Sequence, residues 1–214
     1  MLRVFVGDDG RHGNQLGVVL DGAAVRPERR QPFAAELGFP ETVFVDDPEH
    51  GDIRIFTPSM ELPFAGHPSV GTGWMLRVDT LRPPAGDVPV RRQGDLTWIA
   101  GRQEWAPPFE RVELGSPADV DALAGPPSGQ DLAAMWAWED EAAGRVRARV
   151  FAPAIGVEED EATGAAAVRL GSQLGRDLEI HQGRGSVIHV HPREDGMVEV
   201  GGRVVVDEVR SLPN

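Results

Sequence analysis

Short apolar runs separated by Gly, Pro and Asp occur along most of the chain, and they predict its secondary structure. Runs rich in Val, Ile and Phe between turn-forming residues are typical of β-strands. We expect strands in the first half at 2–6, 16–20, 42–45, 52–57, 87–92 and 96–101. We expect strands in the second half at 135–139, 145–153, 178–182, 186–191 and 197–209.

Other segments carry small or charged residues at helical spacing. They predict helices at 27–38, 68–78, 116–125 and 160–174, with Gly38 as the stop of the first helix. The stretch 105–115 is expected to be a polar connection. Strands and helices mix without strict alternation, which favours an α+β fold over a doubly wound sheet.

One pattern occurs twice. RIFTP at 54–58 returns as RVFAP at 149–153, and each is followed by small residues at helical spacing, GHPSVGTGWML and DEATGAAAVRL. This repeat predicts two related halves. We therefore expect an N-terminal lobe at 1–97 and a C-terminal lobe at 98–214.

The start of the helix in the first half offers a binding site for an anion. Proline is favoured at the first helical position, so Pro68 would begin the helix and His67 would be its N-cap. The amides of Ser69, Val70 and Gly71 would then lack partners within the helix and point outward with its positive end. Such a helix end can hold a carboxylate.

The corresponding helix start in the second half has Asp160 as its expected N-cap, before EATGAA. If the two lobes face each other, an anionic substrate would lie between His67 on one side and Asp160 on the other. The alternatives are that Asp160 is only a cap and that His67 is an ordinary packed or exposed histidine.

Glu41 is a third candidate, because it directly precedes a strongly apolar strand. Packing by Phe39, Val43 or Phe44 would remove its carboxylate from water and raise its pKa, as a general acid or base near neutral pH requires. The alternative is an exposed Glu at the start of a strand.

Composition limits the chemistry. The chain has no Cys, Lys or Tyr, which excludes thiolate nucleophiles, Cys-ligated zinc and a Schiff base. Proton transfer must be carried by carboxylates, by the six histidines or by hydroxyl groups that they activate.

Charge and length limit the partners. A formal charge of −13 argues against nucleic acid or an anionic membrane as a partner. No apolar run approaches the length of a membrane span, and MLRVFVGDDGRHG lacks the order of a signal peptide, so we expect a cytoplasmic protein.

Several spaced motifs, in the same order from end to end, resemble those of the PhzF family of phenazine-biosynthesis isomerases. They are GNQLGVV (13–19), PETVFV (40–45), RIFTPSMELPFAGHPSVGTG (54–73), RVFAPAIGVEEDEATGAAA (149–167) and HQGRGSVIHV (181–190).

The resemblance implies the diaminopimelate epimerase-like fold, in which each of two similar lobes is a mixed sheet curled around a central helix. It also implies an active site between the lobes, a frequent homodimer, and catalysis without cofactor or metal. Family members move a proton on a small carboxylate such as trans-2,3-dihydro-3-hydroxyanthranilate. By motif, the catalytic residues are Glu41, His67 and Asp160.

The sequence departs from the family pattern in two ways. Glu161 and Ala165 stand where the family usually has Pro and Ser, so a hydroxyl group that would contact the substrate is gone. The second lobe is also expected to be shortened, between about Gly101 and Met135.

Both lines of argument predict the same mechanism. Glu41 would remove a proton from a substrate carbon and return it elsewhere, while His67 and Asp160 orient or polarise the substrate. The residues expected to bind this small anionic substrate are Gly66, Pro68, Ser69, Thr163, Gly164 and Ala165.

Two alternatives stay open. A catalytically reduced relative could bind a small acid or form a structural homodimer. A zinc enzyme is the other, since His189 and His191 alternate on one strand face, although no third ligand is evident nearby.

Overall fold

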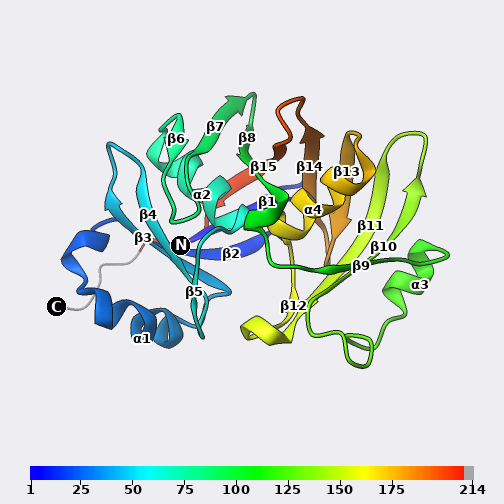
Figure 1. The fold of residues 1–214 in the computed structure, drawn as a ribbon, viewed down its shortest axis with the longest axis horizontal. Coiled ribbons are helices and arrows are strands. Elements are labelled where there is room, and N and C mark those ends of the chain that lie inside the picture. The colour runs from blue at the N-terminus through cyan, green and yellow to red at the C-terminus, as the bar shows by residue number, and fades with distance from the viewer. Residues whose placement is uncertain (210–214) are drawn as a thin grey trace.

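A curled sheet of fifteen strands runs through both halves of the described chain and surrounds two central helices (Figure 1). The structure is a computed structural model, and it describes residues 1–209. The order along the main path of the sheet is β5-β4-β3-β2-β1-β15-β14-β13-β11-β10-β9.

The first lobe is built around helix α2 (Gly66–Leu76), which contacts β1, β2, β8 and β15. Its first eight residues are all buried. The other elements of this lobe are β1 (Leu2–Val6), β2 (Asn14–Val19), α1 (Pro27–Leu37), β3 (Glu41–Asp47), β4 (Asp52–Phe56), β5 (Glu61–Leu62), β6 (Thr80–Leu81), β7 (Val88–Gln93) and β8 (Leu96–Gly101), with a short 3₁₀ turn at Gly22–Ala24.

The second lobe is built around helix α4 (Gly164–Leu174), which contacts β14 and β15. The other elements are β9 (Glu110–Glu113), α3 (Pro117–Asp121), β10 (Ala133–Asp140), β11 (Arg145–Ala152), β12 (Val157–Asp160), β13 (Leu178–Gln182), β14 (Ser186–Pro192) and β15 (Val198–Val206), with 3₁₀ turns at Gln103–Trp105 and Pro153–Ile155.

The two lobes repeat one topology, which confirms the prediction of two similar halves. In the first, β2 pairs in parallel with β3, β3 and β4 are antiparallel, and so are β4 and β5 before α2 begins. The strands β9, β10, β11 and β12 repeat these pairings in the same order before α4. Helices α1 and α3 occupy equivalent places between the parallel strands.

The last strand joins the two lobes. β15 pairs with β1 through its second half and with β14 and β8 through its first half. The division into 1–97 and 98–214 stays a prediction, because this strand pairs with strands of both lobes.

The helix starts differ from the expected elements, and four short strands, β5, β6, β9 and β12, were not expected. Helix α2 begins at Gly66 with Ala65 as its N-cap, not at Pro68 with His67 as the cap. Helix α4 begins at Gly164 with Thr163 as its N-cap, not at Asp160, because Asp160 still pairs with Val150 of β11.

The short strand β9 lies in the segment expected to be a connection. Its polar sequence, ERVE, does not predict a strand, and the strand pairs in parallel with β10. Neither β9 nor β12 has a run of apolar residues that sequence patterns could detect.

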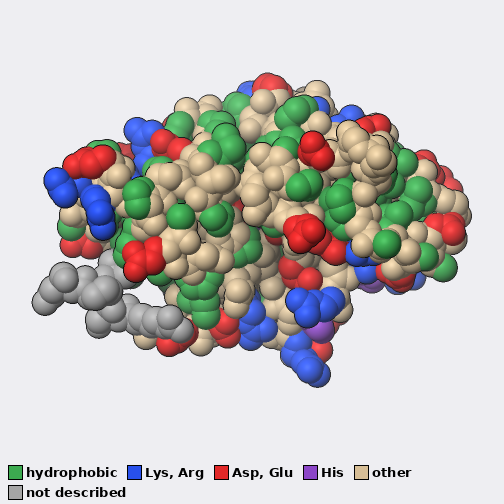
Figure 2. Space-filling model, turned by 90° about the horizontal axis from the view of Figure 1, so that it is seen from below, with side chains coloured by type: hydrophobic (Ala, Val, Ile, Leu, Met, Phe, Trp, Pro, Cys, Tyr) green, Lys and Arg blue, Asp and Glu red, His purple; other side chains and the backbone are tan. Residues whose placement is uncertain are grey.

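Two surface features bear on possible partners. On the face seen in Figure 2, acidic side chains are distributed among arginines and hydrophobic side chains instead of forming one patch. Within residues 1–209, no helix combines the length and hydrophobicity needed to cross a lipid bilayer.

The N-termini of the two central helices meet at a pair of glycines. A Cβ on Gly66 would lie 2.5 Å from the Cα of Gly164, and a Cβ on Gly164 would lie 2.8 Å from the Cα of Gly66. Both distances are far below van der Waals contact and involve backbone atoms, so neither position has room for a side chain.

We expect Gly66→Ala to destabilise the protein by about 1–3 kcal/mol, because the new methyl group must push the two helix starts apart. Urea denaturation measures this change in the free energy of unfolding. Gly125→Ala is the control, since its Cβ would have nothing within 4 Å. Equal stability of the two variants would contradict close packing of the helix starts.

Candidate active site

A small cavity lies between the lobes, where the N-termini of α2 and α4 meet. Its volume is about 20 Å³, room for about one water molecule. The lining comes from both lobes: Glu41, Leu62, Phe64, Ala65, Gly66, His67, Pro107, Phe109, Ala152, Ile155, Val157, Asp160, Thr163, Gly164 and Ala165.

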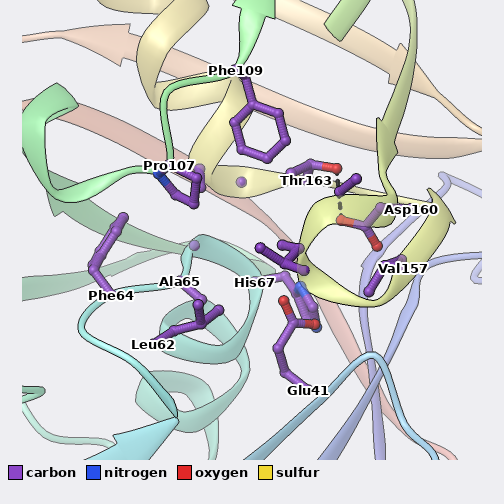
Figure 3. Close-up of a pocket in the computed structure, with 15 residues that line it drawn as sticks. Glu41, Leu62, Phe64, Ala65, His67, Pro107, Phe109, Val157, Asp160 and Thr163 are labelled. Carbon is purple, nitrogen blue, oxygen red and sulfur yellow. Dashed lines mark hydrogen bonds and ion pairs between the residues drawn. The ribbon is translucent and has the colours of Figure 1, made fainter. Parts of the chain in front are cut away.

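Glu41 and His67 form a buried pair at this cavity (Figure 3). Glu41 is the first residue of β3, and His67 is the second residue of α2. The Oε2 atom of Glu41 lies 3.3 Å from Nε2 of His67, with the residues only 7% and 2% exposed. The prediction that Glu41 is buried is therefore confirmed, and the exposed alternative is wrong.

Burial favours the neutral form of both groups, so it shifts their pKa values in opposite directions. It raises the pKa of Glu41 well above its ordinary value, and the nearby negative charge of Asp160 raises it further. Burial lowers the pKa of His67 to about 3. Glu41 thus keeps its proton to higher pH than an ordinary glutamic acid, while His67 is an uncharged imidazole at neutral pH.

Asp160 enters the cavity from the other lobe, at the end of β12. Its Oδ1 accepts a hydrogen bond from Nδ2 of Asn14, and its Oδ2 accepts one from Oγ1 of Thr163, each at 2.6 Å. Burial raises the pKa of Asp160 to about 6, although these two hydrogen bonds oppose the shift. The structure thus brings all three predicted catalytic residues together.

The predicted substrate-binding residues divide into two groups. Gly66, Thr163, Gly164 and Ala165 line the cavity. Pro68 and Ser69 do not belong to its lining, because α2 begins two residues earlier than expected.

Because α2 begins at Gly66 and not at Pro68, the backbone amides that are free for a ligand also differ from those expected. The N–H of Ser69 donates to the carbonyl of Ala65, so the first amides without a partner inside α2 are those of Gly66 and His67. In α4 the first such bond runs from Ala167 to Thr163, which leaves the amides of Gly164, Ala165 and Ala166 without one.

Sequence reasoning missed Asn14 and Gln182, which hold Asp160 in place. Nδ2 of Asn14 also contacts the carbonyl of Ala162 and lies 3.3 Å from Nδ1 of His67. The amide of Gln182 donates to the Asp160 carbonyl and to the Thr163 hydroxyl. Both strands carry other polar residues, Gln15 in β2 and Glu179 and His181 in β13, so no local pattern singled out either residue.

At equivalent positions of the two lobes, a polar group of the cavity in one lobe corresponds to an apolar residue in the other. Strand pairing makes Leu62 the counterpart of Asp160, since each pairs with the corresponding residue of β4 or β11. By the same register, Leu132 corresponds to Glu41. Ala165 corresponds to His67 as the second residue of its helix.

The zinc alternative receives no third ligand from the described residues. His191 contacts Asp177, and His189 lies 3.9 Å from Glu179. Within residues 1–209, no three His, Asp or Glu side chains gather in a metal-binding arrangement.

Two similar lobes curled around central helices, with acid and base groups in the cavity between them, define a protein of the epimerase-like α+β fold. Residues 4–125 and 128–205 match the family model described as phenazine biosynthesis-like protein, PhzC-PhzF. The chain is also 33% identical to trans-2,3-dihydro-3-hydroxyanthranilate isomerase from Pseudomonas aeruginosa, over 80% of this chain and 78% of that protein. The chain therefore belongs to the PhzC-PhzF family, and it is an isomerase of that family.

Solved structures agree on the fold. A phenazine-biosynthesis PhzC/PhzF protein from Clostridium difficile has a TM-score of 0.77 and 19% identity, with 100% of this chain and 98% of that chain covered. A predicted epimerase from Pseudomonas aeruginosa has a TM-score of 0.72 and 25% identity, with 95% and 94% covered.

The alignment with the Pseudomonas isomerase also bears on chain length. It spans 216 positions but contains only 80% of this 214-residue chain, so the relative carries residues that this chain lacks. The expected place of the missing residues, between Gly101 and Met135, stays a prediction.

We expect Asp160→Asn to change how stability depends on pH. A carboxyl group whose pKa is about 6 when folded and 3.8 when unfolded stabilises the fold below pH 4, and this contribution is lost as pH rises to 6. The variant lacks this loss, so its stability relative to wild type should rise by up to about 3 kcal/mol across that window. Urea denaturation at a series of pH values measures it.

Asp87→Asn is the matched control, because Asp87 is exposed and outside the cavity. Its profile should follow that of the wild type. A profile of Asp160→Asn parallel to the wild type would show that Asp160 does not titrate in this range.

Proposed function

We propose that this isomerase moves a proton on a small cyclic or amino-acid-like carboxylate by general acid–base catalysis, without cofactor or metal. Glu41 exchanges a proton with a substrate carbon, and His67 and Asp160 lie where they can orient or polarise the substrate. The observation that carries this proposal is the buried pair of Glu41 and His67, 3.3 Å apart in the cavity between the lobes. The similarity of this chain to the trans-2,3-dihydro-3-hydroxyanthranilate isomerase of Pseudomonas aeruginosa supports the proposed substrate class.

The helix ends supply the binding site for the carboxylate. Among residues 1–209, no Arg side chain lines the cavity, so the positive groups available there are the amides of Gly66, His67, Gly164 and Ala165. The positive ends of both helix dipoles favour an anion at the same place. The apolar lining residues, including Phe64 and Phe109, suit a hydrocarbon ring or chain next to that carboxylate.

The distribution of polar groups favours a proton shift over inversion of a carbon centre. Inversion requires one acid–base group on each face of the carbon. Here the counterparts of Glu41 and His67 are Leu132 and Ala165, neither of which can carry a proton. The second lobe does contribute Asp160, but both of its carboxylate oxygens accept hydrogen bonds, from Asn14 and Thr163. Removal and return of the proton on one side of the substrate therefore fits this cavity better.

Substrate entry requires the lobes to separate, because a cavity of about 20 Å³ cannot hold a six-membered ring. The Oγ of Ser59 in the first lobe donates a hydrogen bond to the carbonyl of Ile155 in the second, at 3.0 Å. Since Ile155 lines the cavity, this contact would break when the cavity opens.

The proposal includes a homodimer in the cytoplasm, with a small anionic substrate and neither nucleic acid nor membrane as partner. These expectations rest on the family resemblance and on the charge of −13. A second candidate is a catalytically reduced member that only binds a small acid, favoured by the Ala165 methyl group in the cavity wall.

We expect Glu41→Gln to lower the rate of proton exchange by about a hundredfold to ten-thousandfold, because the amide cannot transfer a proton. The rate is followed by NMR as deuterium uptake in heavy water, starting with trans-2,3-dihydro-3-hydroxyanthranilate and continuing with a panel of cyclic and acyclic amino acids. Glu36→Gln, on the exposed side of α1, should keep the wild-type rate.

Unchanged exchange in Glu41→Gln would remove Glu41 from the chemistry. Protection of the wild type against heat by a panel compound, without any deuterium uptake, would favour the binding protein over the enzyme.

A further inference from the structure

We propose that Asp160 passes protons between the small cavity and a second, water-exposed groove on its other side, and that Glu41 gains and loses its proton by this path. This inference rests on the proposed function for the role of Glu41. It goes beyond that function, in which Asp160 only orients or polarises the substrate.

The second space is a polar groove with a volume of about 350 Å³, room for several water molecules. The titratable or charged residues of its lining are Arg3, His12, Glu159, Asp160, Glu161 and Arg184. Its lining residues His12, Gln15 and Arg184 are exposed, so bulk water reaches the groove. Among residues 1–209, Asp160 alone lines both this groove and the small cavity.

The two carboxyl oxygens of Asp160 are divided between these spaces. Oδ1 accepts a hydrogen bond from Asn14, which lines the groove and not the cavity. Oδ2 accepts one from Thr163, which lines the cavity and not the groove (Figure 3). Each carboxyl oxygen has two acceptor positions, so each keeps one besides these bonds. Asp160 can therefore exchange a proton with the groove at Oδ1 and with the cavity at Oδ2.

Hydrogen bonds fix which oxygen faces which space. The Thr163 hydroxyl accepts from Nε2 of Gln182 at 2.9 Å, so its single hydrogen is free to go to Asp160. The Asn14 amide also donates to the carbonyl of Ala162 at 3.0 Å. Rotation of the Asp160 carboxyl group would break two hydrogen bonds of 2.6 Å, so each oxygen keeps its side.

Glu41 has no direct access to the groove. It is 7% exposed and does not line that space, and its Oε2 has no hydrogen-bond partner in the described part of the chain. Burial raises the pKa of Glu41, so the resting group holds its proton, yet a base must lose that proton before it can take one from carbon. The pKa of Asp160, about 6, makes both of its forms accessible near neutral pH.

The proton balance of the path closes in two opposite steps. In the outward step, neutral Asp160 releases the proton on Oδ1 to water in the groove. A water molecule in the cavity takes the proton of Glu41 and gives one of its own to Oδ2. Glu41 becomes a carboxylate, Asp160 stays neutral, and the groove gains one proton. The inward step reverses each transfer and restores the starting state.

The groove contains groups that can pass the proton on to bulk water. Glu161 follows Asp160 directly, and its Oε1 accepts hydrogen bonds from the Ser186 hydroxyl and from the backbone amide of Arg184. The imidazole of His12 has no hydrogen-bond partner among residues 1–209 and is exposed. Both side chains line the groove, within the same space as Oδ1 of Asp160.

The first experiment follows the proton of Glu41 without any substrate. The infrared C=O band of a protonated carboxyl group shifts when deuterium replaces its hydrogen, and Glu41→Gln identifies the band of Glu41. After rapid mixing with heavy water at neutral pH, we expect this shift to be slower in Asp160→Asn than in the wild type by about a hundredfold or more, because an amide cannot relay a proton. Equal rates would overturn the proposal, since protons would then reach Glu41 without Asp160.

The second experiment leaves Asp160 intact and narrows the groove. Gln15 is exposed on β2 and lines the groove but not the cavity, so the indole of Gln15→Trp would fill part of the groove. We expect it to slow the exchange at Glu41 severalfold. Gln93→Trp is the matched control, because Gln93 is exposed on β7 and outside the groove, and it should keep the wild-type rate.

An unchanged rate in a folded Gln15→Trp variant would overturn the path through the groove. Thermal unfolding shows whether each variant folds, and where Asp160→Asn does not, Gln15→Trp decides. Because the infrared measurement needs no substrate, its result is independent of the proposed function. Absence of deuterium uptake by every panel compound would reject that function, whereas exchange at Glu41 that does not depend on Asp160 would reject the proton path alone.

Discussion

The contact between Gly66 and Gly164 is the constraint on which the rest of the site depends. Each central helix begins at one of these glycines, and each glycine leaves room only for the backbone of the other. This contact brings two sets of unpaired helix amides to the same point, although they lie in different lobes. It also places the cavity at the lobe interface, so that each lobe contributes part of the lining.

Burial determines the protonation states of the acid and base groups in this cavity. Glu41, His67 and Asp160 lie in a space that admits about one water molecule, and removal from water is the main cause of the pKa shift of each group. The hydrogen bonds are distributed unequally, since Asp160 has two side-chain donors while Oε2 of Glu41 has none. Asp160 is thus held in one position, and the proton of Glu41 is left available for transfer.

Two copies of one topology have become chemically different at the cavity. Glu41 and His67 of the first lobe correspond to Leu132 and Ala165 of the second, while Asp160 of the second lobe corresponds to Leu62 of the first. At each of these three positions, only one lobe carries a group that can hold a proton.

The sequence by itself determined most strands, the repeat and the burial of Glu41, because these depend on local spacing and on the apolar neighbours of each residue. It could not place the first residue of α2 or α4, which is why Pro68 and Ser69 lie outside the lining of the cavity. The positions of these helix starts depend on the contact between Gly66 and Gly164 and on the pairing of β12, which lie far apart in the sequence. Only the tertiary structure brought Asn14 to Asp160, because 146 positions separate them and no local pattern records that contact.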